Sequence, residues 1–110
     1  MKIWVMLNYD LGLKGDYQSL YRFLDNHRAL DCGNCNAAFE VQVSFDTFDE
    51  ICEEIRTLLS KEVVFSQTDR IYLTVTDKHK QMRGKFLFGG RRRAVWEGYG
   101  DIPTPGDNIF

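Results

Sequence analysis

The sequence has no apolar run long enough to cross a membrane as a helix, and it contains only three cysteines. An odd, small number of cysteines does not provide the disulfide framework of a small secreted protein. The short apolar run at the start is followed by a charged turn that contains glycine, so we expect no signal peptide. These absences favour a reduced, cytoplasmic protein with no membrane partner.

Two catalytic classes also lack support. No glycine-rich phosphate-binding motif is present, and none of the four serines has a histidine at a spacing typical of nucleophilic catalysis. Hydrophobic residues make up 44% of the 110 residues and aromatic residues 14%, which is enough for a folded core. We expect a single domain over residues 1–100 and an extended tail over residues 101–110, which contain Pro103 and Pro105.

Periodic patterns predict alternating strands and helices. Strands are expected at residues 3–9, 37–44, 71–76 and 85–88, with helices at residues 16–28 and 47–59. Asp16 is a plausible N-cap of the first helix, and Thr47 with Glu50 forms a capping-box pattern before the second. The Gly89-Gly90 pair predicts a turn or a bulge; as a turn it would lead into a terminal hairpin that ends near Tyr99.

This order of elements indicates an α+β fold, a two-layer ferredoxin-like sandwich with two helices on one face of an antiparallel sheet. An extra C-terminal strand or hairpin would extend the sheet. The opposite face would be bare, and the outward aromatics Trp4, Tyr72 and Trp96 predict that it is a homodimer surface.

Asp10 is the leading candidate for a catalytic and metal-binding residue. It follows a buried strand and precedes a helix, a place where folds of this class carry working groups. A carboxylate suits Mg²⁺, and a two-fold axis would bring a second Asp10 beside the first. The alternative is that Asp10 only caps the amides of the turn that follows.

The basic residues are strongly clustered, although the formal net charge is only −2. Residues 78–93 contain seven basic residues and no acidic one, so the rest of the chain has 14 − 7 = 7 basic and 16 acidic residues, a balance of −9. Such a cluster beside aromatics predicts a nucleic-acid-binding surface; the alternative is a solvated hairpin paired with the acidic second helix. The seven are Lys78, Lys80, Arg83, Lys85, Arg91, Arg92 and Arg93.

Cys32 and Cys35 form one C-x-x-C pair, which is half of a zinc site. Gly33-Asn34 between them predicts a tight turn, and a strand follows instead of the helix that a thioredoxin-like motif requires. We therefore expect a turn with two partly buried thiols; a zinc-stabilised module is the alternative.

Three short segments resemble a known family. Residues 7–11 (LNYDL), residues 15–21 (GDYQSLY) and Leu30-Asp31 before an aromatic-containing strand look like the CRISPR-associated adaptation-subunit group of small ferredoxin-like proteins, closest to its SinR-like and VapD-like branches. The capped second helix and residues 69–72 (DRIY) fit the family in the same order. The resemblance covers about residues 1–77. Residues 32–36 and 89–93 do not follow the family pattern.

The resemblance implies a homodimer, a nucleic-acid surface and Mg²⁺-dependent endonuclease activity at paired Asp10 residues. Other members of the family keep the fold as a scaffold that binds duplex without cutting it. The alternative from another class is a non-catalytic protein-interaction component of a defence or toxin–antitoxin system. Whether the chain is an enzyme stays open at this point.

Overall fold

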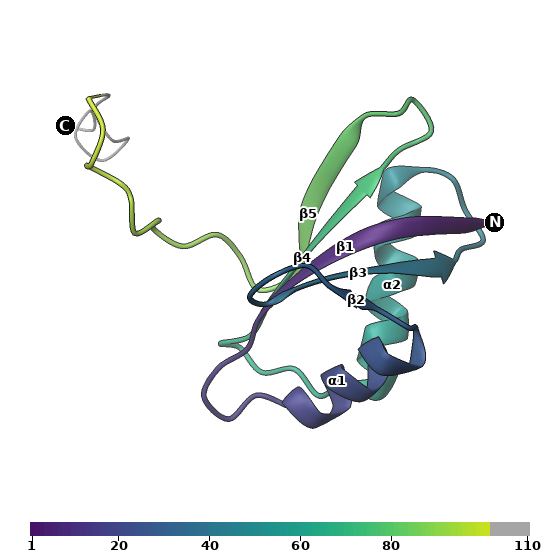
Figure 1. The fold of residues 1–110 in the computed structure, drawn as a ribbon, viewed down its shortest axis with the longest axis horizontal. Coiled ribbons are helices and arrows are strands. Elements are labelled where there is room, and N and C mark those ends of the chain that lie inside the picture. Colours follow the sequence, from purple (N-terminus) through teal and green to yellow (C-terminus); the bar gives the residue numbers. More distant parts are fainter. Residues whose placement is uncertain (102–110) are drawn as a thin grey trace.

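A computed structural model describes residues 1–101 (Figure 1). The predicted tail therefore lies, apart from residue 101, outside the described residues. None of the helices within residues 1–101 has the length and apolar character to cross a membrane. In chain order the elements are β1 (Lys2–Asp10), α1 (Tyr17–Asn26), β2 (Leu30–Asp31), β3 (Asn36–Gln42), α2 (Phe48–Glu62), β4 (Arg70–Thr76) and β5 (Met82–Phe88).

The strands form one antiparallel sheet in the order β2-β3-β1-β4-β5. The central strand β1 pairs with β3 on one side, where Val5 lies opposite Phe39, and with β4 on the other, where Leu7 lies opposite Leu73. The predicted α+β class, with an antiparallel sheet, two helices and an added C-terminal strand, is confirmed.

The core lies between the sheet and both helices, which cover the same face (Figure 1). Alternate residues of each strand point to this face, as the period of two requires. From the helices, the fully buried side chains include Leu20 and Phe23 of α1 and Ile55 and Leu59 of α2. Burial of such side chains contributes about 1.5–3 kcal/mol each, so this apolar layer is what holds the two helices to the sheet.

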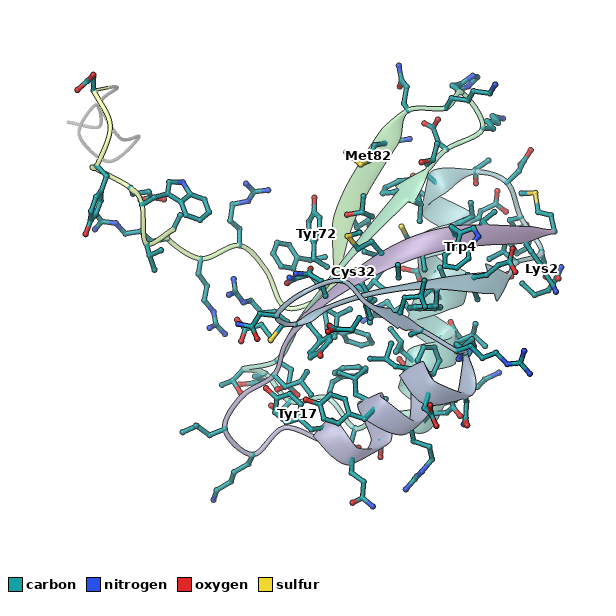
Figure 2. All side chains as sticks on the ribbon, in the orientation of Figure 1. Lys2, Trp4, Tyr17, Cys32, Tyr72 and Met82 are labelled. Carbon is teal, nitrogen blue, oxygen red and sulfur yellow. The ribbon has the colours of Figure 1, made fainter. Side chains whose placement is uncertain are left out.

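The opposite face of the sheet has no layer over it within residues 1–101. Trp4 of β1 and Met82 of β5 lie there, and Trp4 is 56% exposed (Figure 2). Met6 of β1, which shares this side of the strand with Trp4, is 43% exposed. A shallow hollow of about 220 Å³ runs between these three side chains. The expected bare face is thus present, with Trp4 and Tyr72 on it, but the prediction is wrong for Trp96, which lies after β5 and belongs to no strand of the sheet.

The predicted terminal hairpin is wrong. Residues 91–101 form no strand, and β5 instead pairs with β4 across a tight turn at residues 77–81. Gly89 ends β5 with φ +71°, where a Cβ would lie 2.5 Å from the carbonyl oxygen of Asp69. Glycine is therefore required there, because the chain turns away from the sheet close to the β4 backbone and any side chain would collide with it.

The two predicted helix starts differ in outcome. Asp16 is the N-cap of α1, and its Oδ1 accepts a hydrogen bond from the amide of Ser19 at 3.2 Å. The capping box at α2 is wrong, because the Thr47 hydroxyl donates to the Glu50 carboxylate at 2.6 Å and caps no backbone amide.

Candidate nucleic-acid interface

A groove of about 520 Å³ lies beside the bare face, between the sheet and the chain that leaves β5. Four arginines and three aromatic residues line it, and we call it the arginine groove. It is lined by Arg70, Tyr72, Phe86, Arg91, Arg92, Arg93, Ala94, Val95, Trp96 and Glu97.

Short hydrogen bonds hold the outer wall of the groove in place. Arg92 Nη2 donates to the carbonyl oxygen of Thr68 at 2.9 Å, which ties residues 91–97 to the loop before β4. Arg93 pairs with Glu97 at 3.1 Å, and the other carboxylate oxygen of Glu97 accepts the amide of Ala94 at 3.2 Å. These bonds leave Arg91 and most of the Arg93 guanidinium facing solvent.

The inner wall is aromatic. Tyr72 and Phe86, which are register partners on β4 and β5, pack edge to face with ring centroids 4.9 Å apart. Gly84, next but one to Phe86, is needed because a Cβ there would meet the Tyr72 ring. Trp96 stands on the outer wall and is 72% exposed. A large exposed aromatic ring among arginines is suited to stacking on a flat ligand.

Asp10 ends β1 directly opposite Arg70 of β4. Both Nε and Nη2 of Arg70 donate to the same oxygen, Asp10 Oδ2, at 3.1 Å and 2.6 Å. The Asp10 side chain is 49% exposed and that of Arg70 is 26% exposed. Asp10 therefore balances the charge of an arginine and does not cap the following turn.

Magnesium binding at Asp10 stays a prediction. Asp10 offers one carboxylate, which is already held by Arg70, and residues 1–101 contain no group of three or more His, Cys, Asp or Glu side chains that could hold a metal ion. Mg²⁺ is commonly held by one or two carboxylates together with water and substrate phosphate, and a second copy of the chain would add a second Asp10.

Tyr9, the neighbour of Asp10, faces the helix side. Burial raises the pKa of its hydroxyl above 10.0, and the nearby Tyr21 acts in the same direction. The two rings pack edge to face at 6.1 Å. Tyr9 is thus protonated at neutral pH and acts as a packing residue at this position.

The seven basic residues do not share one surface. Arg91, Arg92 and Arg93 line the arginine groove, whereas Lys78 and Lys80 lie in the β4–β5 turn at the other end of the seven-residue strand β5, roughly 20 Å away at about 3.3 Å per residue. The remaining two point to the helix side. Arg83 stacks on Phe48 of α2 at 4.3 Å, and Lys85 lies 3.8 Å from Asp49.

The sequence did not reveal the structural role of Asp69. This side chain is 1% exposed and is the buried charged residue among residues 1–101. Its Oδ1 accepts the amide of Gly12 at 2.7 Å and its Oδ2 accepts the amide of Ser66 at 2.8 Å. A Cβ on Gly12 would collide with Thr68. Asp69 thus joins the loop after Asp10 to the loop before Arg70. The only signal in the sequence is Ser66 three residues before Asp69, an ordinary turn pattern.

The C-x-x-C pair forms the predicted turn between β2 and β3. The amide of Asn36 donates to the carbonyl of Gly33 at 2.9 Å, which closes the turn, and Cys35 adopts φ +62°. Both thiols are free; Cys35 is half-buried as predicted, whereas Cys32 is exposed, so the prediction of two partly buried thiols is wrong for Cys32. Cys52 is buried in α2, and burial raises the pKa of its thiol.

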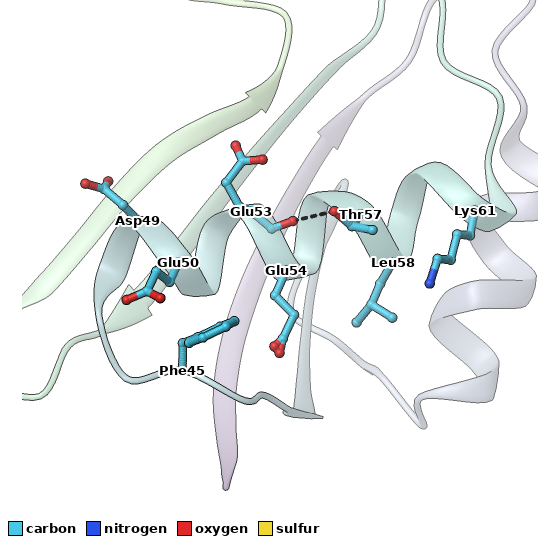
Figure 3. A pocket seen from close by; sticks show the side chains of 8 residues that line it. All are labelled: Phe45, Asp49, Glu50, Glu53, Glu54, Thr57, Leu58 and Lys61. Atoms are coloured by element: carbon cyan, nitrogen blue, oxygen red, sulfur yellow. Dashed lines mark hydrogen bonds between the residues drawn. The ribbon is translucent and has the colours of Figure 1, made fainter.

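A second hollow, of about 490 Å³, lies along the outer side of α2 (Figure 3). Its apolar floor is formed by Phe45 and Leu58, and four acidic side chains surround it. Two of these are already engaged, since Glu54 accepts the amide of Ser44 and Glu50 accepts the Thr47 hydroxyl. Its acidic character makes it unsuitable for a phosphate ligand.

No protein-family model, no curated protein and no solved structure matches this chain.

Proposed function

We propose that this protein binds nucleic acid in the arginine groove. The observation that carries the proposal is the lining itself, in which four arginines line one groove together with Tyr72, Phe86 and Trp96. Guanidinium groups bind phosphate oxygens with paired hydrogen bonds, and aromatic rings stack on bases. The combination favours strands with unpaired bases, because bases inside a duplex are already stacked on each other.

The overall formal charge of −2 is no obstacle to this function. A polyanion responds to the local field, and the groove concentrates Arg70, Arg91, Arg92 and Arg93 against the single acid Glu97 among its lining residues. The acidic side chains of α2 lie on the helix side, away from this groove. They would orient the molecule so that the groove faces the nucleic acid.

The protein would act as a homodimer through the bare sheet face. Trp4, Met6 and Met82 place exposed apolar surface there, and a self-complementary two-fold contact would cover it. We also propose that β1 to β4 with the two helices form a ferredoxin-like fold. The order β2-β3-β1-β4 supports this, and the same arrangement follows from the resemblance to CRISPR-associated adaptation subunits.

Cleavage of the nucleic acid stays a prediction and is not needed for this function. Asp10 of one chain offers a single carboxylate that is paired with Arg70, and a dimer that brings two Asp10 carboxylates together would enlarge the donor set. A binding protein without catalysis, such as a scaffold in a defence or toxin–antitoxin system, accounts for the groove equally well.

The proposal is tested by two double variants with the same charge change. Arg91→Gln with Arg93→Gln alters the groove, and Lys78→Gln with Lys80→Gln alters the β4–β5 turn. We expect the groove variant to bind a single-stranded oligonucleotide roughly tenfold or more weakly. The slope of log K against log salt concentration should become shallower by about 1.4, which is about 0.7 for each of the two lost phosphate contacts. The turn variant should bind almost as the unaltered protein does.

Fluorescence anisotropy in EDTA over a series of salt concentrations measures both quantities. Absence of binding by the unaltered protein at low salt would rule the function out and favour docking on an acidic protein. A loss confined to the turn variant would move the site to Lys78 and Lys80.

A further inference from the structure

The Asp10–Arg70 pair has an unusual position for a surface ion pair, because its arginine also lines the arginine groove. The two side chains come from adjacent strands at directly opposed positions, so the pairing is set by the register of the sheet. Arg70 donates two hydrogen bonds to one carboxylate oxygen, Asp10 Oδ2. A phosphate group that binds the Nε–Nη2 edge of Arg70 would need the same two donors.

A carboxylate and a phosphate present similar oxygens to a guanidinium group, and each can engage two of its N–H groups. Arg70 cannot give the same two donors to both. The pair is about half exposed on the Asp10 side, so the carboxylate can return to water when Arg70 leaves it. The cost of separation is small, since exposed ion pairs are worth little.

We infer that Asp10 is an internal competitor of the nucleic-acid phosphate for Arg70. In the free protein Asp10 occupies the guanidinium group, and a phosphate in the groove displaces it. Arg70 is thereby a fourth phosphate-binding arginine that the cluster of basic residues in the sequence did not include. This inference rests on the proposed function and assigns Asp10 a role in setting affinity.

The two roles of Asp10 predict different results. If Asp10 is only catalytic, its neutralisation should leave binding unchanged in the absence of metal, whereas a competitor for Arg70 should strengthen binding when it is neutralised. Measured in EDTA, Asp10→Asn should tighten binding of a single-stranded oligonucleotide about two- to fivefold. It should also steepen the salt dependence by about 0.7, the value for one additional phosphate contact. Asp10→Ser should behave in the same way and serves as the second variant.

A double-variant cycle separates release of Arg70 from a general change of charge. In an Arg70→Ala background, Asp10→Asn should give no steeper salt dependence and at most a small gain in affinity. Asp25→Asn, which removes one exposed charge on α1, is the matched control and should leave the salt dependence unchanged.

The outcomes distinguish the two proposals. If the unaltered protein binds and the Arg91/Arg93 variant weakens binding, but Asp10→Asn has no effect, the competitor role is overturned and the proposed function stands. If the Asp10→Asn gain persists in full without Arg70, the competitor role is likewise overturned. If no form of the protein binds, both proposals fail.

Discussion

The carboxylate of Asp69 accepts a hydrogen bond from the backbone amide of Gly12 at 2.7 Å, across 57 positions of the chain. With the amide of Ser66 on its other oxygen, this buried group joins the two loops that flank Asp10 and Arg70. The loops that border the candidate site are therefore fixed to each other by one side chain.

Replacing Asp69 should destabilise the whole domain. Asp69→Ala would leave two amides without their partner, and each part-buried amide costs about 1–3 kcal/mol. We expect the free energy of unfolding to fall by about 2–6 kcal/mol, the sum for two amides, measured by urea denaturation. Asp25→Ala, at an exposed position of α1, is the control and should change stability little. A loss below about 1 kcal/mol for Asp69→Ala would show that the loops are held by other contacts.

Association through the bare face should depend on Met6, which lies on the central strand and is 43% exposed. Light scattering of the unaltered protein should give twice the chain mass of 12.8 kDa. Met6→Lys should give the mass of one chain, because a buried lysine at a two-fold contact would meet its own copy. Val64→Lys is the matched control, since Val64 is an exposed apolar residue outside this face. A monomeric unaltered protein at high concentration would contradict the dimer.

Acid should lower the stability of the folded protein because it protonates the carboxylate of Asp16. The backbone amide of Val64 donates a hydrogen bond to this carboxylate, and Ser19 donates to it as well. These hydrogen bonds hold the pKa of Asp16 below its ordinary value of 3.8. Because the folded pKa is lower than the unfolded one, the stabilisation is fully present above about pH 3.8. It is lost as the pH falls through the folded value. Asp77 in the β4–β5 turn has a lowered pKa for the same reason, with the amides of Gln81 and His79 as donors.

The measurement is thermal unfolding between pH 2.5 and 7. Asp16→Ala should lower the Tm by a few degrees at pH 7, and the difference from the unaltered protein should shrink toward pH 2.5. A difference that is constant over this range would mean that the charge of Asp16 does not contribute.

The sequence was informative where one segment decides its own structure. The strand that ends at Asp10 and the amphipathic second helix were predicted because their apolar residues repeat with the period of a strand or a helix. The Cys32–Cys35 turn was predicted from local turn chemistry. The antiparallel α+β class then followed from the order of these elements.

Contacts between distant segments could not be predicted. The Gly89-Gly90 pair resembles a hairpin turn, yet the hairpin uses residues 77–81, where the Asp77 side chain accepts the amides of His79 and Gln81. The pairing of Asp10 with Arg70, 60 positions away, depends on sheet register. The arginine groove depends on how Gly89 directs the chain after β5, and no local pattern encodes that direction.

The most direct test of nucleic-acid binding uses the two tryptophans, Trp4 on the bare face and Trp96 on the wall of the groove. In Trp4→Phe the only tryptophan fluorescence comes from Trp96, and a base that stacks on it should quench the emission. We expect saturable quenching by a single-stranded oligonucleotide that is reversed by salt, whereas Trp96→Phe should show little quenching. Unchanged Trp96 emission over the whole titration, or equal quenching of Trp4, would contradict binding in the arginine groove.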